Sequence, residues 1–344
     1  MYKWFEALGE NEDIVIASGV RLSRNLEKYP FSKKISDSDA IHMVEEVLKE
    51  FETYADEEFG YIECNLGELS EIEKFAMVER QILSKEIAVK KQCSGLVMSE
   101  DESTSILINE EDHLKIQALA GGANMQKAYE KASEVDDYAS ESLEMAFSEK
   151  YGYLTSSPSN VGTGLRASYL MFLPALGGAN KINRLSEEVM KYGVGLKGVY
   201  GDGAEGVGHI YELYNEKTLG STEAELLENL RGIMEQVAAQ ERKRREYLLA
   251  NNYDEIEDQV FRSYGVLKYA KQMNSKDAMT LLSQIKFGAD ARIIQFEKPL
   301  NIYKMIMEVQ PYSLQCRSGK YVGSKVRDKL RAQYLGANLS EVIN

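Results

Sequence analysis

Residues 109–113, with the sequence NEEDH, place three consecutive carboxylates in front of a histidine, directly after an apolar run that ends at Ile108. Carboxylates this close together repel one another, which costs free energy unless they face a site that uses them. Such a loop could orient a cationic substrate and accept a proton from it. The alternative is a solvated acidic turn, which on spacing alone is the commoner arrangement.

Residues 155–166, with the sequence TSSPSNVGTGLR, form a second segment that could do chemistry. Small residues and glycines allow the backbone to approach a ligand closely. The single arginine, Arg166, could bind a phosphate or a carboxylate with its planar fork of donors. A tight structural turn is an equally good interpretation of the same run.

Residues 201–206, with the sequence GDGAEG, formally match the dinucleotide-binding pattern GxGxxG. In that motif the glycines open a helix whose N-terminus meets a pyrophosphate, whereas here the chain continues into a strand-like segment at 209–215. We therefore interpret the match as accidental, and the sequence contains no GxxxxGKS/T phosphate loop. The histidines His42, His113 and His209 lack the spacing of metal ligands, so no protein metal site is predicted.

The 344 residues include 41 Lys and Arg against 55 Asp and Glu, which gives a formal net charge of -14. This balance argues against a general nucleic-acid or anionic-membrane binder, which needs a basic surface. The three cysteines are far apart and indicate neither disulfides nor a zinc cluster. No apolar stretch approaches the roughly 20 residues of a spanning helix, and the N-terminus lacks a signal-peptide pattern. We expect a cytoplasmic globular protein with reduced thiols.

The elements that must position these segments are predicted from hydrophobic spacing. Short apolar runs predict strands at 14–17, 96–98, 105–108, 194–200 and 209–215. Mixed apolar and charged spacing predicts helices within 37–55, 67–92 and 126–149. The first strand is expected to enter a polar loop at 18–25, and the strand at 105–108 delivers the chain into the acidic segment.

The C-terminal third is predicted to be helical. Thr222 and Glu225 fit a capping box that opens a long charged helix toward Leu249, whose basic cluster at 242–245 is expected to be a solvated face. Ser275 is the expected N-cap of a later helix with an apolar stripe, and Gly288 its expected stop. We place a domain boundary near residue 250, which divides the chain into domains at 1–250 and 251–344.

Taken together, these segments resemble the phosphagen (ATP:guanido) kinase family, and within it the bacterial protein arginine kinases. The resemblance spans almost the whole chain and includes SGVRLSRN at 18–25, INEEDH at 108–113, GYLT at 152–155, NVGTGLRAS at 160–168 and GVYG at 198–201. Residues 262–270 and 327–332 resemble the extra C-terminal domain of the protein arginine kinases, which creatine kinases lack.

The resemblance implies an α+β fold in which a bent, mainly antiparallel sheet flanked by helices forms the kinase domain. An all-helical C-terminal domain for phosphoarginine recognition and dimerisation follows. It also implies Glu111 as the catalytic base, with Glu110 and Asp112 shaping its loop. ATP would be the phosphoryl donor, with Mg²⁺ held through the nucleotide phosphates. The residues implied to bind the nucleotide are Ser18, Arg21, Gln81, Lys115, Arg166, Ala167, Ser168, Lys197, Gly198, Tyr200, Gly201 and Asp202.

The phosphate clamp implied by the resemblance is altered in this chain. Gly19 stands where the family has an arginine, and Lys115 and Lys197 replace arginine at two other positions. Gln81 replaces a histidine that is usual near the nucleotide, and Ser157 replaces a usual reactive cysteine. Lysine keeps the charge but loses the bidentate fork, so alignment should suffer more than attraction.

The altered clamp leaves two hypotheses open. The first is a protein arginine kinase linked to stress response and protein quality control. Its substrates would be proteins with exposed arginine, its partners an activator or protease adaptor, and its state a homodimer, with neither nucleic acid nor membrane as a partner. The second is a degenerate, weakly active or inactive homologue that acts as a phosphoarginine-binding or regulatory scaffold. The retained Glu111 favours the first.

The resemblance also implies a phosphoarginine site at Arg327, Asp328 and Arg331, where the arginines would bind the phosphate and the aspartate the guanidinium. A helix surface with an Asp and Arg pair three residues apart is the alternative. A kinase for free guanidino metabolites is a further hypothesis, but it leaves the helical C-terminal domain without a role.

Overall fold

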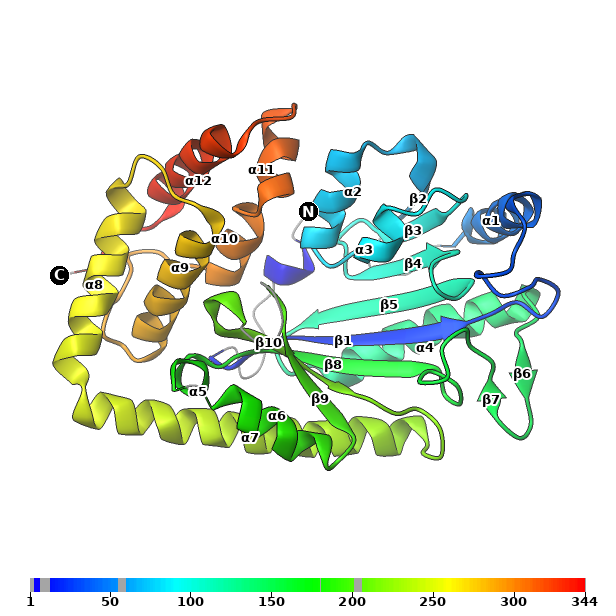
Figure 1. Cartoon of the computed structure of the whole chain (residues 1–344), viewed down its shortest axis with the longest axis horizontal. Coiled ribbons are helices and arrows are strands. Elements are labelled where there is room, and N and C mark those ends of the chain that lie inside the picture. Colours follow the sequence, from blue (N-terminus) through cyan, green and yellow to red (C-terminus); the bar gives the residue numbers. More distant parts are fainter. Residues whose placement is uncertain (1–2, 7–12, 55–59, 180, 201–205, 344) are drawn as a thin grey trace.

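The computed structural model of the chain describes residues 3–6, 13–54, 60–179, 181–200 and 206–343. Its centre is an eight-stranded antiparallel sheet with the strand order β2-β3-β4-β5-β1-β8-β10-β9 (Figure 1). These strands are β1 (Val15–Arg24), β2 (Tyr61–Asn65), β3 (Gly95–Ser99), β4 (Thr104–Ile108), β5 (Leu114–Gly121), β8 (Leu165–Phe172), β9 (Val194–Gly198) and β10 (Ile210–Asn215). A small hairpin pairs β6 (Phe147–Ser148) with β7 (Gly152–Tyr153).

Helices flank the sheet and make up the C-terminal region. The α-helices are α1 (Asp37–Phe51), α2 (Glu71–Glu79), α3 (Lys85–Ala88), α4 (Met125–Ser142), α5 (Pro174–Gly178), α6 (Ile182–Met190), α7 (Glu223–Asn251), α8 (Tyr253–Tyr269), α9 (Ser275–Asp290), α10 (Ile302–Glu308), α11 (Pro311–Ser318) and α12 (Ser324–Asn338). Short 3-10 turns lie at Trp4–Glu6, Leu66–Glu68 and Val207–His209. Within the described ranges, no helix has the length and apolar character needed to cross a membrane.

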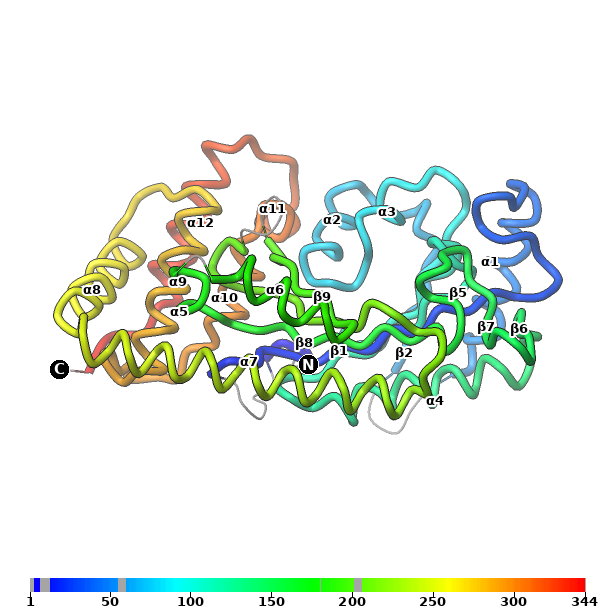
Figure 2. The backbone as a smooth tube through the Cα atoms, turned by 60° about the horizontal axis from the view of Figure 1, so that its bottom comes forward, coloured from blue at the N-terminus to red at the C-terminus, as the bar shows by residue number. Residues whose placement is uncertain are grey.

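The central strand β1 divides its side chains between the two faces of the sheet. Val20 and Leu22 are buried in the main core with residues of α4 and α7, which lie along that face (Figure 2). Gly19 and Arg21 alternate with them and therefore face the other side. The expected polar loop at 18–25 is wrong, because β1 continues to Arg24 and pairs with both β5 and β8.

The predicted capping box of the long helix is confirmed, since the Thr222 hydroxyl accepts from the Glu225 amide and the Glu225 carboxylate from the Thr222 amide. The expectation that the basic cluster at 242–245 is solvated holds for Lys243, which is exposed, but is wrong for Arg245. Arg245 is 7% exposed, and it donates to Glu241 Oε1 at 2.8 Å and to the Phe172 carbonyl at 3.2 Å. This arginine therefore ties α7 to the end of β8.

The C-terminal helices pack onto the sheet through a second core, which joins residues of α8, α9, α10 and α12 with Ala17, Leu119, Leu170 and Phe172. The absence of strands predicted for this region holds in its described part. The α7 helix crosses position 250 and ends at Asn251. The division into domains at 1–250 and 251–344 therefore stays a prediction.

Two details of α9 differ from expectation. Its N-cap is Asn274, whose side chain accepts from the Asp277 amide, so Ser275 is the first helical residue. Gly288 does not stop the helix but lies buried inside it, against Val260 of α8. A Cβ at Gly288 would lie 2.5 Å from Val260 Cγ1, so the glycine is required for the close approach of the two helices.

Gly288→Ala is therefore expected to lower the free energy of unfolding by about 1–3 kcal/mol, because an inserted methyl group forces α8 and α9 apart. Gly265→Ala in α8 is the matched control, since a Cβ there meets no atom within 4 Å. That variant should be neutral or stabilised by up to about 1 kcal/mol. Urea unfolding of both variants measures the difference, and equal stabilities would contradict the packing argument.

Candidate active site

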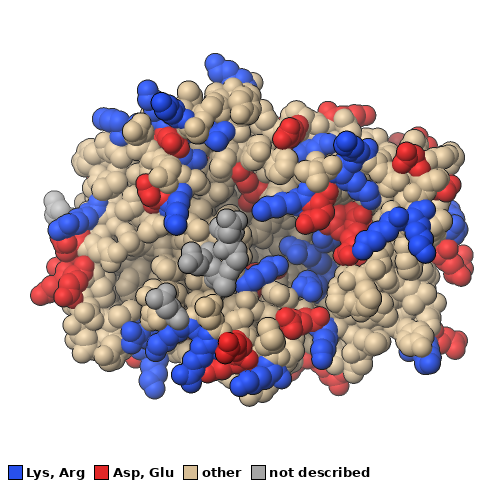
Figure 3. Space-filling view, in the orientation of Figure 1, with Lys and Arg blue, Asp and Glu red and all other residues tan. Residues whose placement is uncertain are grey.

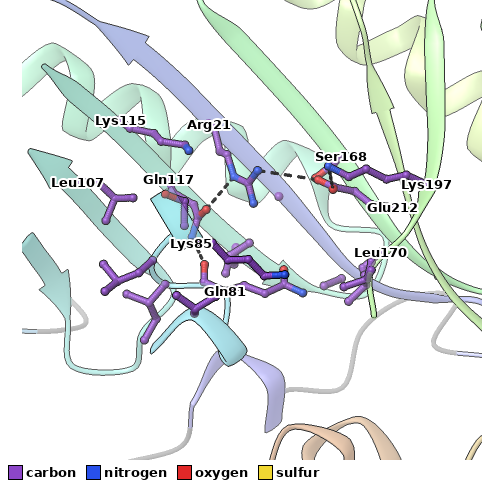
Figure 4. A pocket seen from close by; sticks show the side chains of 18 of the residues that line it. Arg21, Gln81, Lys85, Leu107, Lys115, Gln117, Ser168, Leu170, Lys197 and Glu212 are labelled. Atoms are coloured by element: carbon purple, nitrogen blue, oxygen red, sulfur yellow. Dashed lines mark hydrogen bonds and ion pairs between the residues drawn. The ribbon is translucent and has the colours of Figure 1, made fainter. Parts of the chain in front are cut away.

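Strand alternation brings four cationic side chains to one face of the sheet, opposite the main core. Lys115 extends from β5, Arg21 from β1, Arg166 from β8 and Lys197 from β9. Arg21 lies in register with Arg166 on one side and with Gln117 on the other. Lys and Arg side chains surround a hollow in the middle of this face (Figure 3), and the close view shows Arg21, Lys115 and Lys197 around a shared pocket (Figure 4).

Two adjoining pockets occupy this face. The larger is lined by strands of the sheet and by residues 78 and 81–86, which lie at the end of α2 and around α3. The smaller is lined by the acidic loop at 110–112 and by residues 157, 159 and 160 of the glycine-rich run. Arg21 and Lys115 line both pockets, so these two cations stand where the pockets meet.

Hydrogen bonds connect the polar side chains of the larger pocket (Figure 4). Gln117 donates to the Gln81 carbonyl at 2.7 Å and accepts from Arg21 Nε at 2.8 Å. Glu212 lies 2.8 Å from Lys197 Nζ and 4.0 Å from an Arg21 guanidinium nitrogen. Burial works to raise the pKa of Glu212, but the charges of Arg21 and Lys197 hold it below its ordinary value. Glu212 therefore stays ionised as a counter-charge to the cations.

Hydrogen bonds with neighbouring segments hold the acidic loop in place. Lys90 Nζ donates to the Asn109 carbonyl at 2.6 Å and to the Glu110 carbonyl at 3.0 Å. Asp112 is 2% exposed, and its Oδ1 accepts from Asn25 Nδ2 at 2.7 Å and from the Ser156 amide at 2.6 Å. The loop is thus fixed to the end of β1 and to the glycine-rich run at once.

Glu110 and Glu111 have opposite environments. Glu110 is largely buried, and it accepts from Lys115 Nζ at 2.8 Å and from Ser84 Oγ at 2.5 Å. Burial works to raise the pKa of Glu110, but Lys115 and these hydrogen bonds keep it lowered. Glu111 is exposed at the smaller pocket, and desolvation followed by the charges of Asp112 and Glu110 raises its pKa. Two carboxylates with diverging pKa values indicate different roles, and the stronger base is Glu111.

His113 is a structural residue of the same loop. It is fully buried, its Nδ1 accepts from the Leu26 amide at 3.0 Å, and its Nε2 lies 2.9 Å from the Pro30 carbonyl. Nε2 therefore carries the hydrogen of a neutral ring. Burial lowers the pKa of His113, which agrees with this neutral form.

The glycines of the glycine-rich run approach protein backbone. Gly164 has a φ of 65°, and a Cβ there would lie 2.6 Å from the Ser23 carbonyl oxygen. Gly162 has a φ of 114°, and a Cβ there would lie 2.6 Å from the Thr218 carbonyl oxygen. At these two positions the interpretation of the run as a tight structural turn holds. Its polar residues Ser157, Ser159 and Asn160 nevertheless line the smaller pocket.

The other predicted site residues have different positions. Ser168 and Gly198 line the larger pocket together with Ser18. The Ser18 hydroxyl donates to the Gly122 carbonyl at 2.7 Å and is buried, so this hydroxyl is not available to a ligand. Ala167 is buried in the main core. Tyr200 packs against the second core.

Gly201 and Asp202, and with them most of the 201–206 glycine pattern, lie outside the described residues. The three C-terminal candidates, Arg327, Asp328 and Arg331, lie together on α12 and line neither pocket. In the part of the chain that the structure describes, no group of three or more His, Cys, Asp and Glu residues is arranged to hold a metal ion.

Among the polar residues that line the cleft, sequence reasoning did not assign Ser84, Lys85, Gln117 and Glu212, and it also missed Lys90, which binds the carbonyls of the acidic loop. Gln117 follows Lys115 by two residues on β5, so strand alternation could have found it once the strand was predicted. Glu212 lies within the strand predicted at 209–215, where an isolated acid among apolar residues was a usable signal. Lys85 and Lys90 carry no such signal, because Lys85 reaches the cleft from α3 and Lys90 reaches the acidic loop from the segment after that helix.

Family models match nearly the whole chain. The ATP:guanido phosphotransferase C-terminal catalytic domain matches residues 42–244, and the protein-arginine kinase McsB C-terminal domain matches residues 253–344. These matches identify the class of protein as an ATP:guanido phosphotransferase. The chain belongs to this family, and the resemblance predicted from the motifs is confirmed.

Two relatives that match over almost their full length are both named protein-arginine kinase. The protein-arginine kinase of Brevibacillus brevis is 37% identical over 340 residues, which covers 98% of this chain and 95% of that protein. The protein-arginine kinase of Halothermothrix orenii is 37% identical over 337 residues, which covers 98% of this chain and 96% of that protein.

Solved structures support the fold. The duplicated taurocyamine kinase from Schistosoma mansoni aligns with a TM-score of 0.61 at 24% identity, and this covers 71% of this chain and 36% of that chain. This chain thus spans about a third of that duplicated protein. Lombricine kinase aligns with a TM-score of 0.59 at 18% identity over 69% of each chain. The predicted phosphagen-kinase fold, an antiparallel sheet flanked by helices with a helical C-terminal region, is confirmed.

The lowered pKa of His113 predicts a pH-dependent contribution to stability. The folded protein binds this proton more weakly than the unfolded chain, so protonation favours unfolding. The contribution is present above the unfolded pKa of about 6.5 and is lost as the pH falls through the folded value. His113→Gln should cost about 1–3 kcal/mol near neutral pH, and this cost should shrink toward pH 5.5.

Chemical denaturation of both proteins at several pH values measures that difference. His42→Gln, an exposed position on α1, controls for the loss of one histidine. A cost that stays constant between neutral and acidic pH would show that the neutral ring is not what the fold requires.

Proposed function

We propose that the chain is a protein-arginine kinase, which transfers the γ-phosphoryl group of ATP to the guanidinium of arginine side chains in proteins. The observation that carries the proposal is the junction of the two pockets. Arg21 and Lys115 line both, so cations stand between a larger pocket and a smaller one that holds an exposed carboxylate, Glu111. The protein-arginine kinases that match over the full chain support arginine in proteins as the acceptor.

ATP would bind in the larger pocket with its phosphates toward the cationic side chains. Arg21, Lys115, Arg166 and Lys197 are suited to this task because they form a set of donors on one face of the sheet. Phosphoryl transfer depends mainly on alignment and on stabilisation of the phosphoryl oxygens, for which such donors suffice. Mg²⁺ bound to the nucleotide phosphates would add positive charge at the same place.

The arginine substrate would enter the smaller pocket, where the carboxylates orient its guanidinium. Glu111 would accept the proton that the guanidinium loses as the new N–P bond forms and the bond from the γ-phosphorus to the ADP oxygen breaks. Its raised pKa makes it a better base than an ordinary glutamate. Glu110 is less suited to this role, because Lys115 and Ser84 already bind its carboxylate.

The altered clamp bears on the efficiency of the reaction. A Cβ at Gly19 would lie 3.1 Å from Leu119 Cδ2 and 3.4 Å from Ser168 Oγ, both ends of side chains. The position is therefore closely packed even without a side chain, and it supplies no cation. Lys85 at the rim of the same pocket could supply part of the missing positive charge on the face proposed to bind phosphate. We propose an active kinase on these grounds, while the scaffold hypothesis is not favoured.

Several further properties come from the family rather than from the site. A homodimer, an activator or protease adaptor as partner, a role in stress response and protein quality control, and a cytoplasmic location are proposals of this kind. The acidic charge of -14 agrees with cationic protein segments as substrates.

Glu111→Gln tests the catalytic base. The variant keeps the shape of the side chain but cannot accept the proton, so kcat should fall about 100- to 10,000-fold. Incubation with Mg²⁺, ATP and casein, followed by detection of acid-labile phosphate, measures the activity. Because the reaction needs the carboxylate, the wild-type rate should also fall as the pH is lowered through the raised pKa of Glu111.

Glu141→Gln at the exposed end of α4 is the matched control and should retain full activity. Activity of Glu111→Gln equal to wild type would remove Glu111 from the mechanism. The absence of acid-labile phosphate with the wild-type protein would remove the kinase proposal itself.

Phosphoarginine recognition by Arg327, Asp328 and Arg331 stays a prediction. Arg331 is 1% exposed, and it donates to the Val309 carbonyl at 2.9 Å, to the Met273 carbonyl at 2.8 Å and to Asp328 at 2.8 Å. Replacing Arg331 would therefore disturb the packing of the C-terminal helices as well as any ligand site. Arg327 is half-buried and its side chain donates to the Val322 carbonyl, so it is the better position to change.

If the site exists, Arg327→Ala should weaken the binding of phosphoarginine by about tenfold or more, because a charge-assisted hydrogen bond to phosphate is lost. Titration of the full chain by calorimetry measures the affinity. The control is Arg184→Ala on α6, an arginine that is exposed and remote in the sequence. Equal affinity of Arg327→Ala and wild type would leave α12 without this function.

A further inference from the structure

A cavity lies where the kinase half meets the C-terminal helices, away from the cleft. It has a volume of about 280 Å³, is partly open to solvent, and is lined by α5, the end of α7, the start of α8 and α9. Much of its wall is apolar, with Pro174, Leu248, Ile256, Val260 and Phe287 among its lining residues. No described residue lines both this cavity and either pocket of the cleft.

An arginine without a hydrogen-bond or ion-pair partner among the described residues lines this cavity. Among the described residues, Arg244 takes part in no hydrogen bond or ion pair, and its contact is with the ring of Tyr247, 4.8 Å from the guanidinium carbon. Its neighbours on α7 differ, since Arg242 pairs with Asp13 and Arg245 with Glu241. An arginine carries five N–H donors and a permanent charge, which next to apolar walls favours an anionic acceptor.

Two more polar groups on the wall lack protein partners. The hydroxyl of Ser283, on α9, belongs to a residue that is 2% exposed, and neither it nor His209 Nδ1 has a hydrogen-bond partner among the described residues. Burial lowers the pKa of His209, so this ring is uncharged at neutral pH. One of its nitrogens then donates a hydrogen bond and the other accepts one. Residues with unpaired polar atoms thus line one cavity from three separate segments, and the atoms of Ser283 and His209 are buried in its wall.

The nearby backbone donors are already satisfied. The Ala175 and Leu176 amides at the start of α5 donate to the two oxygens of Glu241, each at 2.9 Å. Glu241 in turn accepts from Arg245 Nε at 2.8 Å. The start of α5 therefore offers no free donors, and the guanidinium of Arg244 is the group that would select an anion.

We propose that this cavity binds a small carboxylate with an apolar body, whose carboxylate pairs with Arg244 while its body packs against the apolar wall. Arg244 is the one Lys or Arg among the described residues that line the cavity, so its single positive charge matches a monoanionic carboxylate better than a phosphate dianion. The bound molecule would touch α5 and α7 on one side and α8 and α9 on the other. The site is separate from the phosphotransferase cleft.

Isothermal titration calorimetry of the full chain with 3-phenylpropionate, in the absence of ATP, tests the proposal. One saturable site is expected, and the neutral 3-phenylpropanamide should bind at least about tenfold more weakly because it lacks the charge. Absence of saturable carboxylate binding, or equal binding of the amide, would overturn the proposal. Kinase activity is not the readout, so the result does not depend on the proposed function.

Two variants locate the binding. Arg244→Gln should weaken the affinity for 3-phenylpropionate about tenfold or more, while Arg231→Gln, an exposed α7 position paired with Glu228, should leave it unchanged. Gly178→Leu fills the cavity from its rim and should abolish binding. A Cβ at Gly178 meets no atom within 4 Å, so this variant is expected to fold. Wild-type affinity in a folded Arg244→Gln or Gly178→Leu protein would overturn the assignment.

Discussion

The geometry of the cleft depends on one buried carboxylate, that of Asp112. Its Oδ1 binds Asn25 at the end of β1 and the Ser156 amide at the start of the glycine-rich run. A buried carboxylate is tolerated only when it is hydrogen-bonded, so these three segments must stay together. These hydrogen bonds fix the position of Glu111 relative to Arg21, because β1 carries Arg21 and the loop carries Glu111. The relative placement of Glu111 and Arg21 thus depends on two structural hydrogen bonds.

The second constraint is the balance of charge on the open face of the sheet. Four cations, Lys115, Arg21, Arg166 and Lys197, would repel one another without counter-charges, and Glu110 and Glu212 supply two. Four positive and two negative charges leave these side chains with a net charge of two, which suits an anionic ligand. The carboxylates also restrain the flexible lysines. This restraint compensates in part for the lost fork of arginine at Lys115 and Lys197.

The sequence identified the segments that line the cleft better than it identified the contacts that hold those segments in place. The acidic loop, the glycine-rich run and the strands at 194–200 and 209–215 were found because local patterns define them. Strand β1 was cut short at Ala17, since its polar residues look like a loop until both neighbouring strands cover it. Arg245 was taken for a surface residue and Gly288 for a helix stop, because the partners Glu241 and Val260 become visible only after the helices pack.

The C-terminal helices take part in shaping the larger pocket. Glu79 at the end of α2 accepts from the Tyr312 amide at 2.9 Å and from the Ser313 amide at 2.7 Å, at the start of α11. Two residues later, Gln81 lines the pocket and donates to the Tyr303 hydroxyl of α10 at 3.2 Å. Since Gln81 has a φ of 65°, its turn is held by these contacts rather than by helix geometry. The wall of the pocket at α2 therefore depends on the C-terminal region, and hydrogen bonds join the two halves beside the cleft.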